Sequence, residues 1–225
     1  MGEFLKGKIS YRGPHGETGR EWFEMVEHEG GLGRTLRAFC EMDEIALTRD
    51  VTMLLDPASR PLDGFCRVTR QGARAGTVLF VCEAAGVRAS GDLAQGGRLA
   101  QHLPVPSGVE YLGLHSLVGD ALIALARGTD APGTFRAIAC VTNSISPDGD
   151  KGLVAMPTAI EVAYRGEESV STAAGTFAAR RYCLRWHPAW EPADLWVHGP
   201  HALFLRLEWA MVGASYELVE LQSGR

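Results

Sequence analysis

Hydrophobic and polar residues alternate along most of this chain, in short runs that end at glycine, proline or aspartate. A period of two is typical of strands that bury one face. Turn clusters at 30–33, 56–61 and 71–76 leave only short connections between runs, which predicts antiparallel hairpins. The predicted strands are residues 8–11, 22–28, 35–42, 45–55, 62–70, 77–83, 87–89, 98–103, 135–142, 158–164, 176–186, 195–197, 202–209 and 216–221.

One segment departs from this pattern, because residues 116–127 are apolar around most of a helix circumference. Ser116 is predicted to cap its start with a side-chain hydroxyl, and Gly128 follows at the left-handed stop position. A helix that is apolar on so many sides is normally packed into a core, here against the concave face of a sheet.

A sheet of ten or more antiparallel strands rarely stays flat, and it curls or closes to remove exposed edges. We therefore predict a mainly β protein with minor α, a strongly curled antiparallel half-barrel or open barrel that encloses the one apolar helix. The length of 225 residues fits a single domain over 1–225. Glycine, at 27 residues, supports the many tight turns that this fold needs.

The net charge limits which partners are expected, and the cysteines indicate the cellular compartment. The net charge of −5 argues against a nucleic-acid surface, which usually needs a basic face. The most apolar stretch, 117–126, is too short to span a membrane, and the first eight residues lack the apolar core of a signal peptide. The five cysteines are widely spaced without a C-x-x-C pair, which favours buried, reduced thiols in a cytoplasmic protein. A homodimer and a monomer both stay open.

The C-terminal third carries a resemblance to known proteins. Residues 175–182, then 194–197, then an alternating strand that ends at Trp209 resemble poorly characterised bacterial proteins similar to the lipoprotein-carrier fold. That resemblance implies a strongly curled antiparallel half-barrel with helical material in its concavity. The sequence is also similar to bacterial enzymes that break down plant-derived aromatic dimers, some of which eliminate formaldehyde from a hydroxymethyl side chain.

The best candidate site lies where the chain enters the apolar helix. His115 precedes the helix, Tyr111 lies just before it, and Asp120 is the only charge within the apolar stretch. A buried carboxylate needs a partner, and it can orient an imidazole that acts as a general base. The alternative is structural: His115 packs against the helix start, and Asp120 pairs with an interior arginine to satisfy burial.

Arginines inside strands are the second set of candidates. Arg49, Arg67 and Arg181 each lie in an alternating strand, so each points either to the cavity or to solvent. A cavity-facing arginine needs a partner or an anion, and Arg67 or Arg181 would then stabilise a developing oxyanion. Arg49 is predicted to bind substrate. The solvated outer face is the alternative for each of them.

Aromatic residues near the C-terminus complete the predicted substrate site. Trp186, Trp196 and Tyr182 are candidate contacts for an aromatic ligand, with core packing as the alternative. His198 and His201 flank a Gly-Pro turn, but no third ligand has a recognisable spacing, so two solvated histidines are preferred to a metal site.

Two functions from different classes fit these residues. The chain contains no G-x-S-x-G elbow, P-loop or dinucleotide-binding fingerprint, so no cofactor is predicted. The first hypothesis is a cofactor-independent acid–base lyase for a small apolar or aromatic molecule, with formaldehyde elimination from a plant-derived aromatic dimer as one such reaction. His115 would take the proton, and Tyr111 or Tyr182 would protonate the leaving group. The second hypothesis is a non-catalytic intracellular binder of a fatty acid or other amphiphile.

Overall fold

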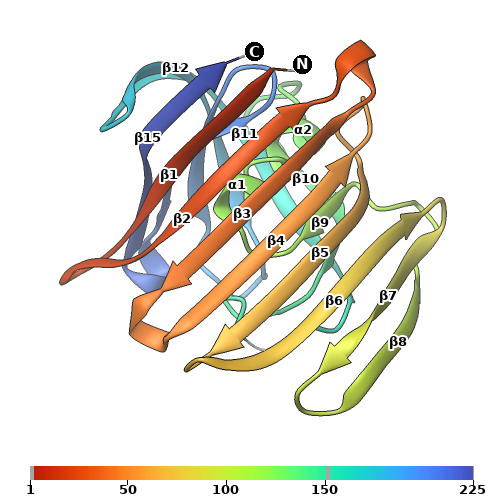
Figure 1. The fold of residues 1–225 in the computed structure, drawn as a ribbon. Coiled ribbons are helices and arrows are strands. Elements are labelled where there is room, and N and C mark those ends of the chain that lie inside the picture. The colour runs from red at the N-terminus through yellow and green to blue at the C-terminus, as the bar shows by residue number, and fades with distance from the viewer. Residues whose placement is uncertain (1–2, 151–152, 225) are drawn as a thin grey trace.

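The fold is one strongly curled sheet of 15 strands (Figure 1). The computed structural model describes residues 3–150 and 153–224. The predicted domain ends at 1–2 and 225 lie outside those residues. The strands are β1 (Phe4–Gly13), β2 (Gly16–Glu27), β3 (Arg34–Met42), β4 (Leu47–Leu55), β5 (Pro61–Arg70), β6 (Ala73–Glu83), β7 (Gly86–Leu93), β8 (Gly97–Pro104), β9 (Tyr111–Gly113), β10 (Phe135–Thr142), β11 (Met156–Thr172), β12 (Gly175–Arg185), β13 (Ala193–His198), β14 (Leu203–Trp209) and β15 (Ala214–Gly224).

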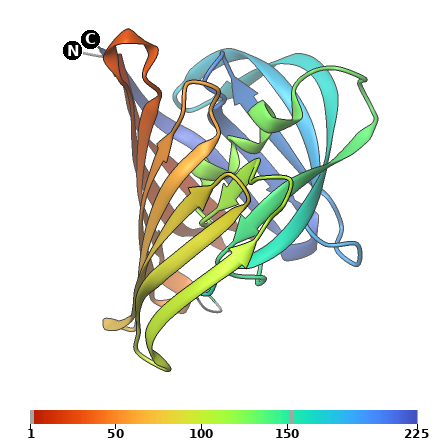
Figure 2. The ribbon, with the colours of Figure 1, turned by 90° about the vertical axis from the view of Figure 1, so that its right-hand side faces the viewer.

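Strands that follow one another along the chain are mostly neighbours in the sheet, and the first strand, β1, also pairs with the last, β15. The order is β8-β7-β6-β5-β4-β3-β2-β1-β15-β14-β13-β12-β11-β10-β9. β1 pairs with β15 in register Phe4↔Gly224, which brings the two ends of the chain together. Every pairing is antiparallel except that of β9 with β10. Strands β8 and β9 are therefore the two edges, and the sheet is the predicted open, curled half-barrel (Figure 2).

Alternation of side chains divides each strand between the hollow and the solvent. In β4, inward positions are fully buried and outward positions are partly exposed along the whole strand. The same alternation in β2 directs Phe23 and Met25 inward and leaves Trp22 on the outer face, 44% exposed. The core consequently fills the concave side of the sheet.

The predicted helix lies inside that concavity, as two short pieces, α1 (Leu117–Asp120) and α2 (Ile123–Arg127) (Figures 1 and 2). Its location and its end at Gly128 (φ 69°) agree with the prediction. The predicted cap is wrong, because the Ser116 hydroxyl makes no hydrogen bond and a carboxylate from β2 takes its place. None of the helices in the described residues is long and apolar enough to cross a bilayer.

Two local differences from the sequence prediction have clear causes. The segment between the predicted strands 158–164 and 176–186 is not a loop, because β11 continues through a bulge, where the register shifts between Tyr164 and Gly166 and Gly166 takes φ 118°. The hairpin instead turns at residues 173–174. Strand β9 was not predicted, because three residues are too short to show alternation. Single 3-10 turns occur at Glu29–Gly31, Asp43–Ile45 and Ala210–Val212.

Candidate functional site

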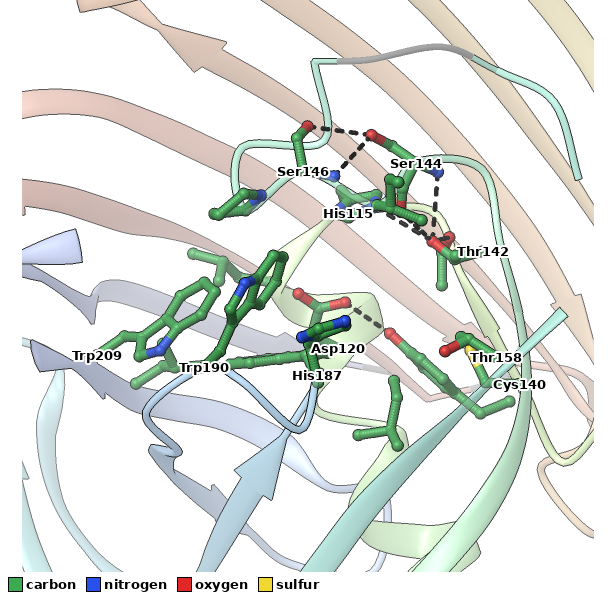
Figure 3. A pocket seen from close by; sticks show the side chains of 18 of the residues that line it. His115, Asp120, Cys140, Thr142, Ser144, Ser146, Thr158, His187, Trp190 and Trp209 are labelled. Carbon is green, nitrogen blue, oxygen red and sulfur yellow. Dashed lines mark hydrogen bonds between the residues drawn. The ribbon is translucent and has the colours of Figure 1, made fainter. Parts of the chain in front are cut away.

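A pocket of about 130 Å³ opens between the helix and the C-terminal strands (Figure 3). Its walls come from the β9–α1 segment, β10, the following loop at 144–147, the start of β11, the turn after β12, and β14 and β15. An apolar cavity of about 150 Å³ can hold one benzene ring. The pocket therefore has the size of a single aromatic ring.

One wall of the pocket is made of tryptophans. The ring of Trp209 lies 4.7 Å from that of Trp186 and 5.6 Å from that of Trp190, measured between centroids. Trp209 Nε1 donates to the carbonyl of Glu191 at 2.7 Å, which fixes its orientation. The indoles are tilted, Trp209 by 43° to Trp186 and by 48° to Trp190, and together they provide an apolar aromatic wall suited to an aromatic ligand.

The opposite side of the pocket carries the carboxyl group of Asp120. The hydroxyl of Tyr111 donates to Asp120 Oδ1 at 2.6 Å (Figure 3). Burial raises the pKa of Asp120 to about 7, although the bond from Tyr111 acts against this, and the nearby Glu21 charge raises it further. A carboxyl group with a pKa near neutrality can both accept and donate a proton under physiological conditions.

Glu21 is a second buried carboxylate, and it holds the helix that carries Asp120. Its two oxygens accept from the backbone N–H groups of Leu117 at 2.7 Å and Val118 at 2.9 Å. The Tyr11 hydroxyl donates to Glu21 Oε2 at 2.8 Å. A negative charge at a helix start satisfies free N–H groups. Glu21 thereby fixes α1, and Asp120 follows within the same turn.

His115 lines the pocket with its ring already hydrogen-bonded. Its Nε2 lies 3.0 Å from the Ser144 carbonyl, so this nitrogen carries the proton and donates. Burial, together with the neighbouring Arg49 charge, lowers the pKa of His115 to about 4. The imidazole is consequently neutral at pH 7, and only its Nδ1 is left to accept a proton. For His115 this arrangement fits the structural alternative better than it fits a strong general base, whereas the hydrogen-bond partner of Asp120 is Tyr111 rather than the arginine of that alternative.

Arg49 points inward, but to backbone oxygens rather than to the pocket. Its Nη1 donates to the His115 carbonyl at 2.5 Å and its Nη2 to the Asp148 carbonyl at 2.7 Å. The guanidinium therefore links β4, the β9–α1 junction and the loop after β10. It lies outside the pocket wall, which is a correction to its predicted substrate contact.

Arg67 and Arg181 are corrections of the same kind. Arg67 lies on the outer face with a side chain 52% exposed, 3.7 Å from Asp50. Arg181 is 41% exposed and forms a two-point ion pair with Asp194 at 3.2 and 2.8 Å. Side chains alternate along a strand, and each of these arginines is on the side of its strand that faces outward. Neither can therefore reach a ligand in the hollow.

Two predicted aromatic contacts also lie away from the pocket. Trp196 is on the outer face, where its Nε1 donates to Glu168 and its ring packs under Arg181. Tyr182 points inward but is fully buried against Tyr164, with ring centroids 5.4 Å apart, and does not line the pocket. Of the predicted contacts, Tyr111, His115, Asp120 and Trp186 do line it.

His187 is a pocket residue that the sequence did not identify. It follows Trp186 in the turn after β12, and its ring lies 5.5 Å from that of Trp190, measured between centroids (Figure 3). The Ala189 N–H donates to His187 Nδ1 at 3.1 Å. In the neutral ring the proton is consequently on Nε2. No spacing rule would have found it, because its position depends on a turn.

Glu21 was also missed, although a signal was present. It shares inward parity with Phe23 and Met25 in a strand whose other buried positions are uncharged. A lone charge on the apolar face of a strand is a marker of a buried network.

The two turn histidines lie near different groups. His198 Nδ1 lies 2.7 Å from the Ala178 carbonyl, and His201 Nδ1 lies 3.1 Å from Glu27 Oε1. Within residues 3–150 and 153–224, His, Cys, Asp and Glu side chains form no group of three suited to a metal ion.

The comparisons with known proteins show the fold alone. No family model matches the chain, and no curated protein matches it. Among solved structures, it is similar to a β-barrel-like protein from Brucella abortus that belongs to a domain family of unknown function, DUF1849. That match has a TM-score of 0.60 and 12% identity, and covers 100% of this chain and 98% of the other. A DUF1089 protein from Pseudomonas aeruginosa matches with a TM-score of 0.47 and 11% identity, over 91% of this chain and 90% of the other. The first match thus shows a fold similar to that of a β-barrel-like bacterial protein of unknown function.

Proposed function

We propose that the protein is a cofactor-independent acid–base lyase that acts on a small aromatic molecule bearing a hydroxyl group. The observation that carries the proposal is the Asp120 carboxyl, with a pKa of about 7, in a ring-sized pocket opposite three packed tryptophans. A proton-transfer group matched to neutral pH and an aromatic wall are what such a reaction requires.

The proposed reaction is formaldehyde elimination from a plant-derived aromatic dimer. The substrate has a hydroxymethyl group on one carbon and a benzylic oxygen on the next. Removal of the hydroxymethyl proton releases formaldehyde as the carbon–carbon bond breaks. That electron pair forms the new double bond, and the benzylic oxygen leaves with a proton. The products are a stilbene, formaldehyde and water or an alcohol, so no oxidant or reductant is needed.

Each step has a candidate group in the pocket. We assign the base to Asp120 rather than His115, because His115 is neutral with its Nε2–H donated to a carbonyl. Tyr111 holds the Asp120 carboxylate in place through its 2.6 Å bond. Asp120, once it has taken the hydroxymethyl proton, gives that proton to the leaving oxygen, and the His187 Nε2–H is the proposed hydrogen-bond donor to the same oxygen at the mouth. One ring of the dimer lies against Trp209, and the second ring lies outside.

The second hypothesis, a carrier of fatty acids, has less support. A carboxylate head group needs a cation, and no lysine or arginine lines this pocket among the described residues. A relation to the lipoprotein carriers is proposed only together with this second hypothesis. A cytoplasmic location is also a proposal, which the five free cysteines favour.

Incubation with a diaryl propanediol carrying one hydroxymethyl group tests the function. We expect equal amounts of formaldehyde, measured by derivatisation, and stilbene, measured by its absorbance. Asp120→Asn should lower the rate at least about 100-fold, and the wild-type rate should rise with pH through about 7 as the base ionises. Arg67→Ala is the matched control and should keep full activity, because Arg67 lies on the outer face. Tight binding of the diol without either product would instead identify a binding protein.

A further inference from the structure

The edge of the sheet at β8 is an unusually complete pairing surface. All eight residues of β8 pair with β7, from Gly86↔Pro104 to Leu93↔Gly97, without a bulge. No described strand pairs with the other side of β8. The opposite edge, β9, has only three residues, and all of them are buried. Among the strands that the structure describes, β8 is therefore the edge that is open to another chain (Figure 1).

The register shows which backbone groups of β8 point outward. The Val105 N–H donates to the Ala85 carbonyl at 2.8 Å, so these two residues continue the β7–β8 register as a hydrogen-bonded pair. In an antiparallel ladder such pairs alternate with pairs that direct their groups away. Odd-numbered residues from Gly97 to Leu103 thus bond to β7. The N–H and C=O groups of Arg98, Ala100 and His102 point to the free edge.

β8 has few of the features that usually prevent a free strand edge from pairing with another chain. Exposed edges are commonly blocked by lysine, proline, a bulge or a covering loop. β8 contains no lysine, and its one proline, Pro104, is at the very end. Two hydrogen bonds also fix β8 to the segment before β11. The Gln101 side chain accepts from the Ala155 N–H at 3.0 Å and donates to the Ala155 carbonyl at 2.7 Å. The edge is consequently rigid and preorganised.

We propose that β8 pairs antiparallel with β8 of a second copy of this chain, across a two-fold axis at Ala100. Such an isologous contact matches each outward N–H with an outward C=O: Ala100 with Ala100, and Arg98 with His102 of the second copy. The side chains at the axis are small, since Ala100 is flanked on β7 by Ser90. Arg98 of each copy approaches the other copy's His102, and Glu83 lies 3.9 Å from that imidazole.

The mass of the full chain in solution, by light scattering after size exclusion or by sedimentation, tests this pairing. We expect a dimer for the wild type and a monomer for Ala100→Pro. Proline removes one outward N–H and leaves the bonds to β7 in place. Ala100→Val keeps that N–H and should remain a dimer. A monomeric wild type at all concentrations, or a dimeric Ala100→Pro variant, would overturn the proposal.

Amide hydrogen exchange on the wild type keeps the test decisive if Ala100→Pro does not fold. If the chain dimerises, the Ala100 and His102 amides should become protected from exchange as protein concentration rises. The exchange rate of the Trp22 amide, which belongs to β2 in the middle of the sheet, should not depend on concentration. Ala100 and His102 amides that exchange freely at every concentration would contradict the pairing.

Discussion

Replacing Asp120 by asparagine should change how stability depends on pH. The pKa of Asp120 is raised from 3.8 to about 7 in the fold. An acid whose pKa is higher in the folded chain than in the unfolded chain makes the folded state bind more protons between the two values. Stability therefore falls as pH rises from about 4 to about 7. Each unit of pKa difference corresponds to about 1.4 kcal/mol, so ionised Asp120 costs about 4 kcal/mol above pH 7.

Urea unfolding of the wild type and Asp120→Asn between pH 4 and pH 8 measures this cost. Asparagine keeps an oxygen that can accept from Tyr111 and has no charge to bury. We expect the stability difference between the two proteins to grow by up to about 4 kcal/mol in favour of the variant, then level off above pH 7. Glu44→Gln removes a carboxylate from an exposed position and is the control for the loss of a carboxylate as such.

A constant difference between wild type and Asp120→Asn over this range would refute the reasoning. It would mean that the Asp120 carboxylate ionises as it does in water. The pocket would then be wetter than its residues indicate, and Asp120 would have no reason to titrate near neutrality.

Three further substitutions test the surroundings of the site. Glu21→Ala leaves two backbone N–H groups and one hydroxyl unpaired in the interior, which should cost about 3 kcal/mol or more in urea unfolding; an unchanged midpoint would show that the helix does not depend on this cap. Gly149→Ala places a Cβ 2.5 Å from the His115 ring at φ 63°, so we expect a loss of at least about 1 kcal/mol, measured by thermal unfolding, and a normal melting temperature would contradict the packing. Arg181→Ala should change stability by less than about 1 kcal/mol, because its ion pair with Asp194 is exposed.

The curled sheet was predictable because alternation is a local property of the sequence. Each strand with a clear period of two was found, and the apolar segment 116–127 could only be buried against the concave face. Failures occurred where the signal was not local. Gly166 reads as a turn, but β11 continues through it as a bulge because β12 pairs on both sides.

The sequence predicted which residues at the helix start line the candidate site, but not which arginines face it. His115 and Asp120 flank the helix start, so any helix inside the hollow brings both to the pocket. Strand parity alone could not decide where Arg67 and Arg181 point, because each strand offers two faces and only the three-dimensional core selects one. Nor could it show that the charge of Arg49 is directed to two carbonyl oxygens.

The proposed reaction requires an aromatic ring to enter the pocket beside Asp120. A crystal structure of Asp120→Asn soaked with the diaryl propanediol tests it most directly. We expect one ring against Trp186 and Trp209, with the hydroxymethyl oxygen within hydrogen-bonding distance of residue 120. A ligand bound elsewhere on the sheet, or a ring in the pocket with its hydroxymethyl group pointing to solvent, would contradict it.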